Sequence, residues 1–136
     1  MKKHLLLVDD DIDEFEFITS LSQEMPALKF SYACDGTSAL ELMSDEMPDV
    51  VLLDMNMHAM NGLECLKKIK ASARLHSVPV YMYSNCHTPN FIQEARQLGA
   101  TDCFKKPTTL DVLRKILVVV LNDSDSVNLI WQKKSI

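Results

Sequence analysis

The chain has no long hydrophobic run: no stretch of its 136 residues approaches the ~20 apolar positions of a membrane-spanning helix. It also has no excess of positive charge, since 14 lysines and arginines face 19 aspartates and glutamates, for a net charge of -5. Without a basic patch, nucleic acid is not expected as a direct partner. The start Met-Lys-Lys-His leads into a short strand rather than a signal peptide, so we expect a cytoplasmic protein without membrane association.

The four cysteines form no C-x-x-C pair, and they are expected to be free thiols in a chain without an export signal. His58, Cys86 and His87 fall in segments that can share a rim, but their spacing matches no zinc pattern. A zinc site is therefore not expected.

The sequence shows no internal repeat, no low-complexity tract and no linker to a second domain. A chain of this length can bury roughly two-thirds of its unfolded surface as one domain. We expect this domain to span residues 1–122, followed by a C-terminal tail over residues 123–136. The tail contains Leu129, Ile130 and Trp131, which is too apolar for a purely solvated end.

Short apolar runs alternate five times with amphipathic segments. The runs lie near residues 3–8, 29–33, 50–53, 78–83 and 102–105, and their lengths are typical of buried strands. Helical spacing follows each run, near residues 11–24, 36–45, from 62, 89–98 and from 110. Such alternation predicts right-handed crossovers, and so an α/β, doubly wound fold with a five-stranded parallel sheet and helices on both faces.

The first helix is expected to carry Ile12, Phe15, Ile18 and Leu21 on its buried face. It is expected to continue to residue 24, because Pro26 disfavours helix in the residue before it.

Polar residues stand where four of the strands end. Asp9 and Asp10 follow the first run, Asp54 the third, Ser84 the fourth and Lys106 the fifth. Because the carboxyl ends of parallel strands meet at one edge, these side chains are expected around one small pocket. Clustered carboxylates repel one another unless a cation neutralises them, and Mg2+ is the natural choice. Asp54 would then accept a phosphoryl group, with Lys106 and Ser84 holding its oxygens.

Each of these residues has a simpler interpretation when taken alone. Asp9, Asp10 and Asp11 are also what a helix cap and an acidic first helical turn would contain. A serine at a strand end and a Lys-Pro pair before a helix are common. Asp54 ends a fully apolar run and is harder to explain in this way. The joint occurrence at the ends of separate strands favours a phosphoryl site.

Five segments resemble, in order and spacing, a response-regulator receiver domain over residues 3–122. They are Leu6-Leu7-Val8-Asp9-Asp10, the segment Pro48 to Met57, Asn61-Gly62, the segment Val78 to Ser84, and the segment Gly99 to Pro107. The resemblance implies a flavodoxin-like sheet with strand order 2-1-3-4-5.

The resemblance also implies a metal site that holds Mg2+. Asp10 would be a direct ligand and Asp9 would act mainly through a metal-bound water. Asp54 would be both a ligand and the phospho-acceptor, and Asn56 would contribute its main-chain carbonyl. Ser84 and Lys106 would bind the phosphoryl group.

A cis peptide bond between Lys106 and Pro107 is a further implication of the resemblance.

The implied function is that of a single-domain response regulator in two-component signal transduction, not an enzyme. A sensor histidine kinase or a histidine phosphotransfer protein would donate the phosphoryl group to Asp54. The chain would then signal by protein contact or relay the group in a phosphorelay. The expected output surface is the fourth helix, the fifth strand and the fifth helix, where Val112, Val118 and Val119 lie off the buried stripe. A downstream protein or a second copy of the chain would bind there.

Two other functions remain as alternatives. One is a phosphate-independent protein-interaction domain on the same fold, against which the complete set of site residues argues. The other is a hydrolase, because Asp54-x-Asn56 after an apolar strand is similar to the haloacid-dehalogenase phosphatases. Those enzymes need a second acid where this chain has Asn56.

Three positions depart from the family pattern. His58 stands where proline is usual, and we expect it to be a solvated loop residue. Asn85 replaces a small residue and is expected to crowd the phosphoryl pocket. Cys103 replaces the usual aromatic residue of the fifth strand, so coupling between Ser84 and that ring is expected to be altered. Phe104 cannot substitute, because neighbouring strand residues point to opposite faces.

Overall fold

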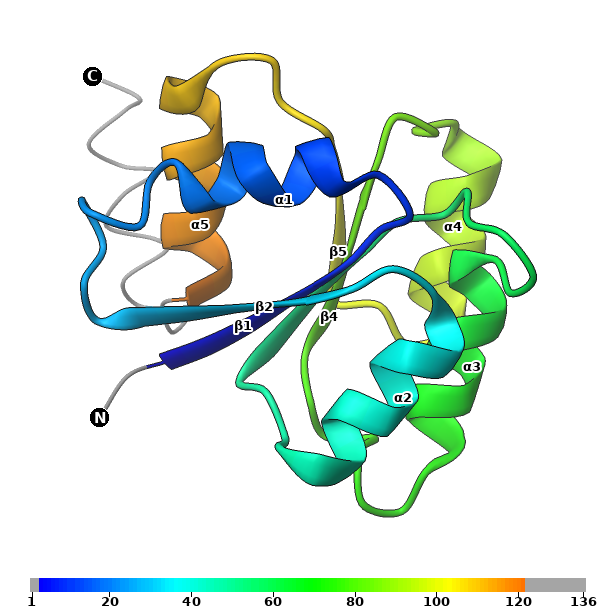
Figure 1. Cartoon of the computed structure of the whole chain (residues 1–136). Helices are drawn as coiled ribbons and strands as arrows, with labels where there is room; N and C mark the ends of the chain where they lie inside the picture. The colour runs from blue at the N-terminus through cyan, green and yellow to red at the C-terminus, as the bar shows by residue number, and fades with distance from the viewer. Residues whose placement is uncertain (1–2, 122–136) are drawn as a thin grey trace. The chain divides into compact units, whose positions relative to one another are not determined.

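Five short strands form the centre of residues 3–106 in the computed structural model, which describes residues 3–121 of the chain. The chain divides after Lys106 into two compact units, each described here by itself. Every neighbouring pair of strands is parallel, and their order is β2-β1-β3-β4-β5 (Figure 1), as expected. The strands are β1 (Lys3–Val8), β2 (Leu28–Ala33), β3 (Val50–Leu53), β4 (Val80–Ser84) and β5 (Asp102–Lys105).

The strand register determines where the polar residues leave the sheet. Val8 of β1 pairs with Leu53 of β3, so the next residues, Asp9 and Asp54, emerge at the same level. On the other side of β3, Ser84 at the end of β4 pairs with Lys105 at the end of β5. The carboxyl ends of four strands therefore form one polar edge.

Helices cover both faces of the sheet in this unit. In Figure 1, α2 (Gly36–Asp45), α3 (Gly62–Ala71) and α4 (Pro89–Gln97) lie on one face and α1 (Ile12–Thr19) lies on the other. Because side chains alternate along a strand, alternate residues of β1 and β3 face α2 to α4. The main hydrophobic core lies on that side, and it includes Leu6, Val8, Val51, Leu53, Met82, Met43, Leu66, Ile69, Phe91 and Ala95.

Each of these four helices begins with a polar side chain that accepts a hydrogen bond from a first-turn N–H. The caps are Asp11, Asp35, Asn61 and Thr88. The sequence predicted the last two, and Pro89 follows Thr88 in the first turn of α4, where its missing N–H costs nothing. Gly99 follows α4 with a φ of 107°, a conformation that glycine adopts readily.

The first helix is shorter than the sequence predicted, since α1 ends at Thr19 rather than at residue 24. The Thr19 hydroxyl donates to the Glu16 carbonyl at 3.2 Å, and the Ser20 hydroxyl donates to the Phe17 carbonyl at 2.6 Å. Such side-chain bonds compete with the helical ladder, and turns follow. The expectation for Ile12 was also wrong: this first residue of α1 is 49% exposed.

The expected cis bond between Lys106 and Pro107 is also wrong, because no peptide bond within residues 3–121 is cis. An X-Pro bond favours trans by about 0.5–1 kcal/mol.

The second unit contains α5 (Leu110–Leu121). Thr109 caps it by accepting a hydrogen bond from the Val112 N–H at 3.3 Å. Leu113, Ile116 and Leu117 are among its buried residues, whereas Val112 is exposed. The tail over residues 123–136 lies outside the described residues. Among the helices that are described, none combines the length and the apolar character that crossing a bilayer would require.

Candidate functional site

Three carboxylates meet at the carboxyl edge of the sheet. Asp9, Asp10 and Asp54 each offer an oxygen, and these oxygens lie within 4.8 Å of one another. The main chain fixes the two buried acids, because the Asp9 N–H donates to the Ala33 carbonyl at 3.0 Å and the Asp54 N–H donates to the Val8 carbonyl at 2.9 Å. The hydrogen bonds of the sheet thus continue into the site and hold Asp9 and Asp54 side by side.

Lys106 places its amine among the carboxylates. Its Nζ lies 2.8 Å from Asp9 Oδ2, 3.5 Å from Asp54 Oδ2 and 3.9 Å from Glu14 Oε1. The Lys106 side chain is only 9% exposed. Burial by itself lowers the pKa of Lys106, but the three carboxylates outweigh that effect and raise it overall. The amine is therefore held in its charged form.

The negative charge of the site exceeds what Lys106 can neutralise. Four carboxylates, those of Asp9, Asp10, Asp54 and Glu14, face one ammonium group. Asp9 is fully buried, and this burial raises its pKa although the Lys106 ammonium opposes the shift. Carboxylate oxygens with an excess of negative charge are the donor set that a hard divalent cation such as Mg2+ requires. The residues present therefore fit this ion.

The start of α3 packs directly against the backbone of Asp54. The Gly62 N–H donates to the Met55 carbonyl at 2.8 Å, and a Cβ on Gly62 would lie 2.2 Å from the Asp54 carbonyl oxygen. Only glycine allows this approach. One carboxylate oxygen of Asp54 accepts a hydrogen bond from the Met55 N–H at 2.8 Å, and the other faces Lys106. Both constraints orient the Asp54 side chain.

Ser84 joins the site through its main chain. Its carbonyl accepts a hydrogen bond from the Lys106 N–H at 3.3 Å, and its buried hydroxyl accepts one from the Cys86 N–H at 3.1 Å. Within residues 3–121, no hydrogen bond joins this hydroxyl to the carboxylates. Asn56 is exposed, two residues beyond Asp54. The structure thus brings together Asp9, Asp10, Asp54 and Lys106, and places Ser84 and Asn56 beside them.

The three residues that depart from the family pattern, His58, Asn85 and Cys103, differ in their exposure to solvent. The His58 side chain is 95% exposed, as expected, but its Nε2 also lies 3.6 Å from Asp10 Oδ2. Asn85 is exposed. Cys103 is buried in the main core, opposite Met82 of β4. Phe104 stacks on Tyr81, with ring centroids 5.7 Å apart.

Sequence reasoning missed Glu14 as a member of the site. Its carboxylate is 22% exposed and lies near the Lys106 amine, and burial raises its pKa. A signal existed in the sequence, because Glu14 lies in the first turn of the helix that starts directly after Asp9 and Asp10 at the same strand end.

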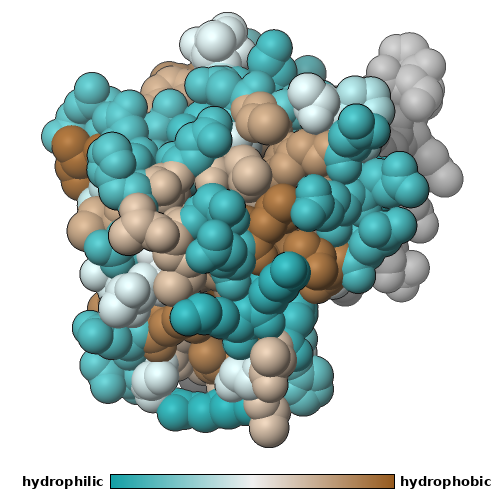
Figure 2. Space-filling model, turned by 90° about the vertical axis from the view of Figure 1, so that its right-hand side faces the viewer, coloured by the Kyte–Doolittle hydropathy of each residue, from teal (hydrophilic) through white to brown (hydrophobic). Residues whose placement is uncertain are grey.

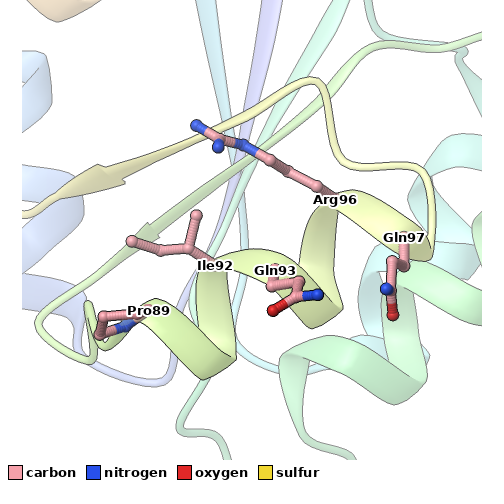
Figure 3. Close-up of a pocket in the computed structure, with 5 residues that line it drawn as sticks. All are labelled: Pro89, Ile92, Gln93, Arg96 and Gln97. Atoms are coloured by element: carbon pink, nitrogen blue, oxygen red, sulfur yellow. The ribbon is translucent and has the colours of Figure 1, made fainter.

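A separate hollow of about 570 Å³ lies on α4, lined by Pro89, Ile92, Gln93, Arg96 and Gln97 (Figure 3). The Ile92 and Arg96 side chains lie on the side of α4 that faces β5 (Figure 3), and Arg96 forms an ion pair with Asp102 of β5 at 2.8 Å. None of the clustered acids lines this hollow, so it is distinct from the acidic site.

Comparisons with known proteins show which family has this arrangement. The sequence model of the family described as the response regulator receiver domain matches residues 5–118 of the chain. The chain is 32% identical over 114 residues to sporulation initiation phosphotransferase F of Bacillus subtilis, which covers 84% of this chain and 90% of that protein. It is 32% identical to the chemotaxis protein CheY of Pseudomonas aeruginosa, over 82% of this chain and 90% of that one.

Among solved structures, the chemotaxis response regulator CheY4 of Vibrio cholerae is similar, with a TM-score of 0.79. It is 28% identical to this chain, and the match covers 88% of this chain and 99% of that one. The strand order and the helix positions described above thus agree with a known fold.

Proposed function

Because the chain belongs to the response regulator receiver domains of two-component signalling, we propose that its Asp54 accepts a phosphoryl group from a histidine of a sensor kinase or a phosphotransfer protein. The observation that carries this proposal is the position of Lys106. Its ammonium group lies between Asp9 and Asp54 in a nearly buried site, where it can neutralise charge on an incoming phosphoryl group. The proposed receiver spans residues 1–122 and acts in the cytoplasm.

Asp9, Asp10 and Asp54 would hold Mg2+, together with the main-chain carbonyl of Asn56. The cluster of carboxylate oxygens within 4.8 Å supports this assignment. The bound ion supplies positive charge to the phosphoryl oxygens during transfer. Without a cation, the same carboxylates repel both one another and the donor.

The transfer itself is a displacement at phosphorus. A carboxylate oxygen of Asp54 forms a bond to phosphorus while the bond from phosphorus to the donor nitrogen breaks, and the histidine leaves with its electron pair. Lys106 then exchanges part of its contact with the carboxylates for the phosphoryl oxygens. Ser84 donates its hydroxyl to one of them, which requires that its present environment rearranges.

The product is a signalling state and not the turnover of a substrate, so we infer that the protein is not an enzyme. We propose that the signal leaves through α4 and β5 to a protein target, with a second copy of the chain as the alternative occupant. Figure 2 shows the side of the molecule on which α3 and α4 lie, where small apolar areas are interrupted by polar ones. Such a mixed surface suits a reversible protein contact. Neither nucleic acid nor a membrane is proposed as a partner.

The test is the intact mass of the protein after incubation with acetyl phosphate and Mg2+, and separately with a phosphorylated histidine phosphotransfer protein. We expect a gain of one phosphoryl group, about 80 Da, that requires the metal and is absent from Asp54→Asn. If neither donor labels the protein while both label a control receiver, the phosphate-independent interaction domain becomes the better description.

A further inference from the structure

Glu14 has no role in the proposed chemistry, yet it points into the site. It lies in the first turn of α1, and its carboxylate is 3.9 Å from the Lys106 amine. Its exposure of 22% contrasts with Asp13 and Glu16 on the same helix, which are both exposed to solvent. The structure therefore places one extra acid beside the Lys106 ammonium group.

Charge counting shows what this acid does to an incoming donor. The four carboxylates and Lys106 sum to -3, and a bound Mg2+ would reduce this to -1. Without Glu14 the loaded site would be neutral. A dianionic donor thus meets a repulsive site in this chain and would meet a neutral one without that carboxylate.

Glu14 also competes for the same ammonium group. Lys106 contacts Asp9, Asp54 and Glu14, and it has to turn toward the phosphoryl oxygens as they arrive. Every carboxylate near Lys106 makes this exchange less favourable. Asp9 and Asp54 have proposed roles in holding the metal and accepting the group, whereas Glu14 contributes only the competition and the charge.

We propose that Glu14 is a specificity-determining residue that disfavours small, freely diffusing dianionic phosphoryl donors. The inference rests on the proposed function, because it concerns access to Asp54. In the disfavoured step, the phosphorus–oxygen bond of acetyl phosphate breaks, acetate leaves with the electron pair, and a bond from phosphorus to the Asp54 carboxylate forms. A donor presented by a protein brings its own docking contacts, which offset the repulsion.

The experiment compares Glu14→Gln with Glu16→Gln, which removes the same charge from an exposed position of the same helix. The rate of mass gain is measured with Mg2+ and either acetyl phosphate, a dianion, or phosphoramidate, which carries less negative charge at neutral pH. We expect Glu14→Gln to accelerate labelling by acetyl phosphate about threefold to tenfold and labelling by phosphoramidate less than about twofold. Raising the ionic strength to about 0.5 M should shrink the difference, because salt screens charge.

Glu16→Gln should label at the wild-type rate with both donors. Thermal unfolding shows whether Glu14→Gln is folded, and Glu14→Ala, which also removes the charge, should reproduce its effect.

The inference is overturned if the wild type is labelled but Glu14→Gln behaves like Glu16→Gln, and in that case the proposed function still stands. It is also overturned if Glu14→Gln is labelled more slowly than the wild type, or if its labelling is accelerated by the same factor with both donors. In either case Glu14 would only position Lys106. If neither small donors nor a phosphohistidine protein labels the wild type, both the inference and the proposed function fail.

Discussion

A buried polar residue lies near each end of strand β1, and the two have different surroundings. At its start, His4 is buried; its main-chain N–H donates to Asp49 Oδ2 at 2.6 Å, and its Nε2 lies 2.6 Å from Ser31 Oγ. Burial lowers the pKa of His4, which favours the neutral ring. Just past its end, Asp9 is buried beside Asp54 and Glu14, with Lys106 as the neighbouring cation.

The two edges of the sheet differ in how far the fold itself balances their polar and charged groups. At the amino edge, where β1 starts, the His4 N–H and Nε2 have local partners and burial favours the neutral ring, although the buried Nδ1 of His4 has no hydrogen-bond partner among the described residues. The carboxyl edge keeps an excess of negative charge that the fold alone does not neutralise. Such an imbalance costs stability in the isolated protein, and it is the condition on which the proposed binding of a cation and a phosphoryl group depends.

The largest effect on this contrast should come from Lys106→Gln. This substitution leaves the Asp9 carboxylate buried without its cation. We expect a loss of about 2–3 kcal/mol in the free energy of unfolding. The loss is smaller than the cost of breaking a fully buried ion pair, because Asp9 can take up a proton. Urea unfolding without divalent cations measures it. Lys105→Gln is the matched control, since this lysine is the exposed last residue of β5, next to Lys106, and should change stability by less than about 0.5 kcal/mol. Equal losses in the two variants would show that Lys106 does not stabilise the acidic cluster.

Magnesium should sharpen the contrast, because the proposed metal site lies at the carboxyl edge. At ten times its dissociation constant, Mg2+ should stabilise the wild type by about 1.4 kcal/mol, which thermal unfolding would show as a higher Tm. Asp10→Asn should lose most of this increment, whereas His4→Gln at the other edge should keep it. If both variants respond alike, the ion acts elsewhere on the protein.

Lowering the pH should reduce the stability contributed by the amino edge and increase the stability contributed by the carboxyl edge. Burial lowers the pKa of His4 below its ordinary value of 6.5, so the unfolded chain takes up that proton first and stability falls as the pH falls through 6.5. Glu46 and Asp49 raise this pKa and Lys29 lowers it, but burial outweighs them. His4→Gln should remove this loss between pH 7 and pH 5, as urea unfolding at each pH would report.

At the other edge, burial raises the pKa of Asp9 and of Glu14. The folded protein therefore takes up these protons before the unfolded chain does, and stability contributed by this edge grows as the pH falls toward 4. Asp9→Asn should abolish most of that gain, measured by the same urea series. If Asp9→Asn shows the same dependence of stability on pH as the wild type, the charge of Asp9 does not destabilise the carboxyl edge.

The smallest effect should come from the exposed ion pair of the amino edge. Lys29 Nζ lies 2.6 Å from Glu46 Oε2, but both side chains are largely exposed. Lys29→Ala should therefore cost less than about 0.5 kcal/mol in urea unfolding, and salt should reduce this further. A loss as large as that of Lys106→Gln would erase the distinction between a solvated pair and a buried one.

Sequence patterns predicted most of the fold because its signals are local. Short apolar runs between turn residues marked the strands, and three of them, β1, β3 and β5, have the predicted bounds. Side-chain caps marked helix starts at Asn61 and Thr88 in the same way. The end of α1 was missed because the hydroxyls of Thr19 and Ser20 compete with its hydrogen bonds, a choice that apolar spacing does not report.

By itself, the sequence determined that Asp9, Asp10, Asp54 and Lys106 would meet, because strand order and alternation bring the carboxyl ends of parallel strands to one edge. Their assigned roles, and those of Ser84 and Asn56, remain predictions. Only the tertiary structure decided which carboxylates contact the Lys106 amine and that Glu14 is among them. That outcome depends on where α1 lies against the edge and how far each side chain reaches, and both are set by packing between segments distant in sequence.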